Sequence, residues 1–197
     1  TGLPSRRGMA SALNSAFDRA DASSRPMSLL YLGIDEFADL NNAYGHELGD
    51  AVLVELARRL ADSAPLRHMV SRWAGDEFLL VMNGDIEQAR PAAAAVLDAV
   101  ARPFQVCGTE IALSASLGIA AYPRHGARHV MVGNVVTAMR AAKTHGGGAY
   151  AEYDVRMGVD VREQQELAHD LRGAVQRGEL ELYYQPKVDA RNLQVTA

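Results

Sequence analysis

A nearly continuous apolar stretch occurs near the start of the chain, at Met27–Ile34, which reads MSLLYLGI. It contains no charged side chain, so its residues do not alternate between a core face and a solvent face. A strand of this kind is typical of the centre of a sheet that is covered on both faces. The stretch therefore predicts a layered domain in which helices enclose a central sheet.

Helical periodicity and turn signals divide the remaining chain into further elements. Helices are expected at 6–24, 51–60, 86–102 and 130–145, strands at 70–73, 77–82, 113–122 and 149–153, and a small hairpin at 104–111. This order predicts an α/β (α+β) sandwich with a mixed central sheet and helices on both faces, rather than a doubly wound parallel sheet.

Composition narrows the functional class. Hydrophobic residues make up 48% of the chain and charged residues 22%, which is typical of a globular protein. The net charge of −4 argues against a nucleic-acid-binding domain. The single cysteine, Cys107, favours a reducing compartment, and no apolar run approaches the roughly 18–20 residues of a membrane span. We therefore expect a cytoplasmic location, with no membrane contact from this part of the protein and any anchor lying outside it.

Three motifs occur in order along the chain: TGLPSRR at the start, NNAYGHELGD at 41–50 and RWAGDEF at 72–78. Together they resemble the GGDEF family of diguanylate cyclases over about residues 1–154, which implies the palm-like sandwich of nucleotidyl cyclases. From about residue 163 the segment LRGAVQRGELELYYQPKVD resembles the opening of an EAL domain, the cyclic di-GMP phosphodiesterase module.

These resemblances imply a GGDEF domain at 1–154, a linker helix at 155–178 and the first strand of a truncated EAL domain at 179–197. An EAL barrel needs about 250 residues, so the tail cannot close or catalyse by itself. We expect the chain to be a piece of a longer GGDEF–EAL protein.

The GGDEF family joins two GTP molecules into cyclic di-GMP, and such phosphoryl transfer depends on Mg²⁺ ions and cationic side chains. The resemblance implies that Asp76 is a metal ligand, that Glu77 is its catalytic acidic neighbour and that Gly75 lies against substrate. Ala74 replaces the first glycine of the signature, at a cost of about 1 kcal/mol if that position needs a positive φ. The alternative is that both acids only stabilise a solvated turn.

The other part of the implied metal site departs from the family pattern. The segment 33–38 reads GIDEFA where active relatives carry Asp-x-Asp-x-Phe-Lys. Gly33 therefore offers only a backbone carbonyl in place of a carboxylate ligand, and Ala38 removes a phosphate contact. Asp35 is a candidate substitute ligand, because residues two apart on a strand share a face. We expect the two-metal arrangement to be lost.

Guanine recognition is better preserved. Asn41 and Asp50 match the residues that the family uses to read guanine, and Phe37 belongs to the same substrate-binding set. A carboxylate that accepts from the guanine N1–H and N2–H₂ groups excludes adenine. Asp50 also directly precedes the helix expected at 51–60, which favours a second role as its N-cap.

Two further family features lie elsewhere. Lys143 matches a phosphate-contacting lysine, with a plain surface lysine as the alternative, whereas Gly147 stands where an arginine is expected. The product-inhibition motif Arg-x-x-Asp should fall at 65–68, which reads Pro-Leu-Arg-His. Both of its anchors are missing, so we do not expect cyclic di-GMP to bind there.

The sequence thus predicts a degenerate, catalytically inactive GGDEF domain with a regulatory role. It would bind GTP, with Mg²⁺ accompanying the nucleotide, or act as an adaptor toward the EAL domain of the same protein. The alternative is an active diguanylate cyclase in which Asp35 replaces the missing ligand. A homodimer is a candidate assembly, and nucleic acid is not an expected partner.

Overall fold

The computed structural model describes residues 1–62, 69–157, 170–174, 177–179, 181–183, 186 and 191. The chain divides into two units, Thr1–Gly158 and Val159–Ala197. The segment 65–68, where the product-inhibition motif was sought, lies outside the described residues. Within the described parts of the chain, no helix has both the length and the apolar composition needed to cross a bilayer.

The second unit is described only in short pieces. Residues 170–174 are helical, as are 155–157 at the end of the first unit, and both segments belong to the linker helix expected at 155–178. Residues 181–183 are not in a strand, so they do not support the strand expected within 179–197. The other residues of these two expected elements lie largely outside the described part of the chain.

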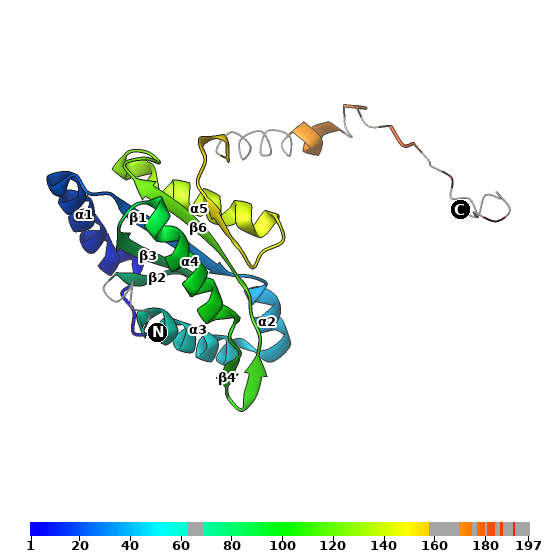
Figure 1. Cartoon of the computed structure of the whole chain (residues 1–197). Coiled ribbons are helices and arrows are strands. Elements are labelled where there is room, and N and C mark those ends of the chain that lie inside the picture. The colour runs from blue at the N-terminus through cyan, green and yellow to red at the C-terminus, as the bar shows by residue number, and fades with distance from the viewer. Residues whose placement is uncertain are drawn as a thin grey trace. The chain divides into compact units, whose positions relative to one another are not determined.

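The first unit is built on a five-stranded sheet with the order β2–β3–β1–β6–β7 (Figure 1). Strand β1 (Met27–Ile34) pairs antiparallel with β3 (Glu77–Asn83) on one side and with β6 (Ala115–Tyr122) on the other. Strand β2 (Val70–Ala74) is antiparallel to β3, whereas β7 (Tyr150–Glu152) is parallel to β6. The predicted mixed sheet is confirmed, and every residue of β1 is buried.

Helices cover both faces of this sheet, as predicted (Figure 1). They are α1 (Arg6–Ser23), α2 (Phe37–Tyr44), α3 (His46–Asp62), α4 (Ile86–Ala101) and α5 (Arg128–Thr144). Buried residues of α1 and α5 pack with Leu29 and Tyr31 of β1, and those of α2, α3 and α4 pack with Leu30 and Leu32. Successive β1 side chains therefore enter two separate cores, which is why the strand is apolar throughout.

A small hairpin stands apart from the main sheet. It consists of β4 (Phe104–Val106) and β5 (Thr109–Ile111), which pair only with each other. Its turn residues Cys107 and Gly108 have φ values of 52° and 75°. Two consecutive left-handed residues are typical of a type I′ hairpin turn, and the predicted hairpin is confirmed.

Helix α3 begins at His46 rather than at Ala51. Asp50 therefore lies inside the helix, and the prediction that it caps a helix at 51–60 is wrong. The apolar periodicity starts late because Leu48 is the only large apolar side chain among the first five residues of α3, where His46, Glu47 and Asp50 are exposed. The connection between α2 and α3 is made at Gly45, whose φ of 87° few other residues adopt.

Helix α5 lies directly against the backbone of β6 at Gly118. A Cβ atom added there would lie 2.1 Å from the carbonyl oxygen of Val135 and 2.5 Å from the backbone nitrogen of Met139. Because both neighbours are backbone atoms, the helix itself would have to move.

We expect Gly118→Ala to lower the free energy of unfolding by about 1–3 kcal/mol, measured by urea denaturation, because it overpacks this contact. The matched control is Gly133→Ala on α5, where an added Cβ meets no atom within 4 Å. That change should leave stability unchanged or raise it by up to about 1 kcal/mol, since alanine favours a helix. Equal effects of the two substitutions would contradict the close packing of α5 on β6.

Candidate functional site

A row of three residues crosses the sheet where β1 ends. The strand register places Gly33 of β1 opposite Glu77 of β3 on one side and opposite Ser116 of β6 on the other. Directly opposed residues of antiparallel strands share a face of the sheet, and here that face is the one covered by α5. The row therefore has side chains at both ends and none in the middle.

The space above Gly33 is filled from α5. A Cβ atom at Gly33 would lie 3.2 Å from both Cε and Nζ of Lys143 and 3.3 Å from Sδ of Met139. The Lys143 ammonium donates a hydrogen bond of 2.9 Å to the carbonyl oxygen of Ile34. The structure thus brings together the predicted phosphate ligand and the predicted metal position, and it joins Lys143 to the backbone there.

Asp35 is held by three hydrogen bonds. Its Oδ1 accepts from Ser116 Oγ at 2.8 Å, and its Oδ2 accepts from Ser114 Oγ at 2.8 Å and from the Gly148 backbone N–H at 2.9 Å. The carboxylate ties the end of β1 to β6 and to the loop after α5. These bonds use three of the roughly four acceptor positions of the carboxylate and fix its orientation, so they count against Asp35 as a substitute ligand.

Gly147 makes this arrangement possible. Its φ is 70°, and a Cβ atom on it would lie 2.9 Å from Oδ2 of Asp35. An arginine at this position would therefore meet both backbone strain and a steric conflict. The hydrogen-bonded position of Asp35 therefore requires a residue without a side chain at position 147, which is why no arginine fits there.

The two acids of the hairpin have different surroundings. Glu77 Oε2 accepts a hydrogen bond of 2.7 Å from the Tyr31 hydroxyl. Burial, together with this carboxylate, raises the pKa of Tyr31 well above its ordinary value, so the phenol stays a hydrogen-bond donor. Among the described residues, no group is hydrogen-bonded to the carboxylate of Asp76, which remains available to a ligand.

The turn between β2 and β3 accepts Ala74 without strain. Gly75 has a φ of 48°, but Ala74 is not among the described residues with a positive φ. The Arg72 side chain donates from Nε to the carbonyl oxygen of Gly75 at 2.7 Å and supports the turn. The substitution in the signature therefore does not disturb the backbone that presents Asp76.

These residues do not fit a divalent cation held by the protein. Such a cation prefers carboxylate and carbonyl oxygens. Gly33 has no carboxylate, the Ile34 carbonyl accepts from an ammonium group, and both Asp35 oxygens are engaged. In the part of the chain that the structure describes, no three Asp, Glu, His or Cys side chains are grouped to hold a metal.

The predicted guanine-reading residues lie on α2 and α3, which follow β1 directly. A Cβ atom at Gly49 would lie 2.0 Å from Oδ1 of Asn41 and 3.2 Å from Cζ of Phe37. Gly49 therefore lets the carboxamide and the ring lie against the α3 backbone. The next residue, Asp50, is exposed, so its carboxylate is accessible to a ligand beside them.

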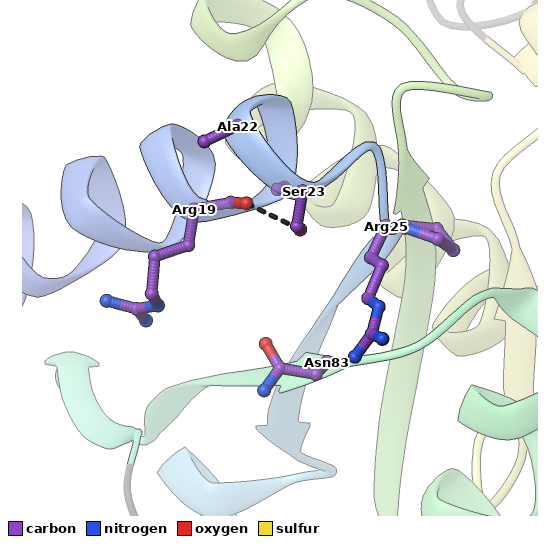
Figure 2. Close-up of a pocket in the computed structure, with 7 residues that line it drawn as sticks. Arg19, Ala22, Ser23, Arg25 and Asn83 are labelled. Atoms are coloured by element: carbon purple, nitrogen blue, oxygen red, sulfur yellow. Dashed lines mark hydrogen bonds between the residues drawn. The ribbon is translucent and has the colours of Figure 1, made fainter.

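A surface pocket of about 440 Å³ lies at the opposite end of β1 (Figure 2). Its lining residues are Arg19, Ala20, Ala22, Ser23, Arg25, Pro26 and Asn83, from the end of α1, the start of β1 and the end of β3. In Figure 2 the Ser23 hydroxyl donates to the carbonyl oxygen of Arg19, at 2.7 Å. None of the predicted site residues lines this pocket, so it is not part of the candidate site.

The family model for the GGDEF domain of diguanylate cyclases matches residues 1–149 of the chain. The chain belongs to the GGDEF family. Its fold agrees with solved GGDEF structures: the GGDEF domain of TpbB (YfiN) from Pseudomonas aeruginosa is 26% identical with a TM-score of 0.77, covering 82% of this chain and 96% of that one. A sensory box/GGDEF family protein from Caulobacter crescentus is 34% identical with a TM-score of 0.68, covering 74% and 96%.

Full-length relatives extend well beyond this GGDEF domain. The chain is 38% identical to the bifunctional diguanylate cyclase/cyclic di-GMP phosphodiesterase MucR of Pseudomonas aeruginosa, over 98% of its own length and 28% of that protein. It is 32% identical to the cyclic di-GMP phosphodiesterase PdeR of Escherichia coli, over 97% of its length and 29% of that protein. The chain thus spans between a quarter and a third of each of these two relatives.

Sequence reasoning singled out Asp35 but missed its partners. Ser114 directly precedes β6 and Ser116 is its second residue, so at a spacing of two along an extended chain they lie on one side. Two hydroxyl side chains at this spacing, opposite a glycine, could have indicated a bound carboxylate. The hydrogen bonds from Tyr31 to Glu77 and from Lys143 to Ile34 had no such local signal, because their partners are far apart in sequence.

We expect Ser116→Ala to lower the free energy of unfolding by about 1.5–3 kcal/mol, because it removes a hydrogen bond to a charged group. The control is Ser28→Ala in β1, which is equally buried but donates to the neutral carbonyl of Gly84 at 2.9 Å. That change should cost only about 0.5–1.5 kcal/mol. Urea denaturation measures both, and a Ser116→Ala cost no larger than the control would contradict the role of Asp35 as a structural anchor.

Proposed function

We propose that this GGDEF domain is catalytically inactive, binds guanine nucleotide beside α2 and α3, and regulates a phosphodiesterase domain of a longer protein. The observation that carries the proposal is the Lys143 ammonium bound to the Ile34 carbonyl above Gly33. Phosphoryl transfer between two nucleotides depends on metal ions held near the reacting phosphates. With no carboxylate at position 33, an ammonium group on the Ile34 carbonyl and Asp35 engaged elsewhere, this point is poorly suited to hold them.

Retention of the guanine-reading residues supports nucleotide binding without turnover. Asn41 and Phe37 lie together over Gly49, and the exposed carboxylate of Asp50 follows it. A carboxylate and a carboxamide together can accept from and donate to the edge of guanine, and adenine presents the opposite pattern at the same positions. GTP is therefore the nucleotide that we expect to bind.

The regulatory part of the proposal concerns a domain outside the described residues. The names of MucR and PdeR include phosphodiesterase activity, and both proteins are more than three times as long as the chain. The tail from about residue 163 resembles the entry to an EAL domain, which makes that domain the expected partner in the same protein. The implied domain boundaries, the cytoplasmic location and a homodimer stay predictions.

Calorimetric titration with GTP, and with ATP as the control nucleotide, tests binding. We expect saturable binding of GTP and none of ATP. Gly49→Ala should weaken GTP binding at least tenfold, because the added methyl group displaces the Asn41 carboxamide without changing any charge. Gly133→Ala is the matched control, since it adds the same methyl group on α5 where no atom lies within 4 Å.

Incubation with GTP and Mg²⁺ or Mn²⁺, followed by chromatography for cyclic di-GMP, tests inactivity. We expect no product at protein concentrations that allow two domains to meet. Robust synthesis that Asp35→Ala abolishes would overturn the proposal and establish the alternative, an active cyclase in which Asp35 replaces the missing ligand.

A further inference from the structure

We propose that the Lys143 ammonium is the resident cation of this site and takes the place of a divalent metal ion held by the protein. The part of this inference that concerns GTP rests on the proposed function. It adds that GTP binding does not require a metal ion held by the protein. It concerns the point where Gly33, Ile34 and Lys143 meet.

The ammonium lies directly over Gly33, which has no side chain. Lys143 lies in the last turn of α5, one turn beyond Met139, and both side chains lie over Gly33. Any larger residue at position 33 would place its Cβ 3.2 Å from Nζ of Lys143, closer than ordinary van der Waals contact. A side chain at position 33 would therefore lie against the end of Lys143, and Gly33 leaves the ammonium without a carboxylate partner there.

The ammonium has spare capacity for a ligand. It carries three donors, and the structure gives one bond, to the Ile34 carbonyl oxygen at 2.9 Å. Among the described carboxylates, none forms an ion pair with it. Two donors and an uncompensated positive charge therefore remain for an anion, and a nucleotide phosphate group is an anion of suitable charge.

The same charge opposes a divalent cation. A metal ion coordinated by the Ile34 carbonyl would have to displace the ammonium or lie beside it, and like charges at that separation repel strongly. The neighbouring carboxylate of Asp35 already accepts three hydrogen bonds, from Ser114, Ser116 and Gly148, and Gly33 supplies no second carboxylate to offset this repulsion. Of the three acids Asp35, Asp76 and Glu77, only Asp76 has a carboxylate without a hydrogen-bond partner among the described residues.

Manganese binding, measured by electron paramagnetic resonance without nucleotide, tests the exclusion directly. We expect no stoichiometric Mn²⁺ binding at submillimolar concentration by the natural chain or by Gly33→Asp, whose new carboxylate would pair with Lys143. The double variant Gly33→Asp/Lys143→Met should bind one Mn²⁺, because it adds a carboxylate and removes the ammonium. Stoichiometric binding by the natural chain, or no binding by a folded double variant, would overturn the inference.

Calorimetry with GTP in Mg²⁺ and again in EDTA tests whether GTP binding needs a protein-bound metal ion. This experiment does not require the double variant to fold. We expect the two dissociation constants of the natural chain to agree within threefold. Lys143→Met should weaken binding in EDTA at least tenfold. Arg140→Met, which removes an exposed positive charge one turn earlier on α5, should change it less than twofold.

The outcomes separate the two proposals. GTP binding that fails in both buffers would overturn the proposed function, and the manganese measurement would still test the resident cation. GTP binding that is lost only in EDTA would overturn the resident cation and leave the proposed function standing. Equal losses in the Lys143 and Arg140 variants would also overturn it, because they would indicate a general effect of charge.

Discussion

Burial of β1 on both faces is the constraint on which the rest of the domain depends. All its residues are buried, and alternate side chains enter the two cores on either side of the sheet. A charged side chain cannot be accommodated along such a strand without a partner, so charged groups can appear only where it ends. The candidate site lies at that end, where Asp35 leaves the strand and α2 begins two residues later.

The residues around this end form a mutually consistent set. Gly33 leaves space for Lys143, and Lys143 occupies the Ile34 carbonyl. Gly147 leaves space for the Asp35 carboxylate, which Ser114, Ser116 and the Gly148 backbone then bind. The departures from the family pattern are therefore not isolated losses, because each open position is filled by a neighbour that forms hydrogen bonds there.

Sequence reasoning identified most of the fold because its signals were local. The apolar run of β1, the periodicity of α4 and α5 and the turn at Cys107 and Gly108 each depend on a few neighbouring residues. The start of α3 was missed because its first five residues contain only one large apolar side chain, Leu48, so helical periodicity appears only further along. The N-cap role of Asp50 was wrong for the same reason.

The sequence predicted which residues belong to the candidate site, but it did not predict how they contact one another. The motifs named Gly33, Asp35 and Lys143, yet the contact between Lys143 and Ile34 joins residues 109 positions apart. The bonds of Asp35 likewise cross from β1 to β6 and to the loop after α5. Such contacts follow from strand register and helix packing, which no local pattern contains.

A crystal structure of the chain grown with a non-hydrolysable GTP analogue and Mn²⁺, with anomalous data at the manganese edge, would show which cations lie at the end of β1. We expect the guanine base beside Asn41 and Asp50, the Lys143 ammonium against the phosphates, and no manganese peak coordinated by protein atoms. A manganese ion bound to the Ile34 carbonyl and Asp76, with Lys143 displaced, would contradict this expectation.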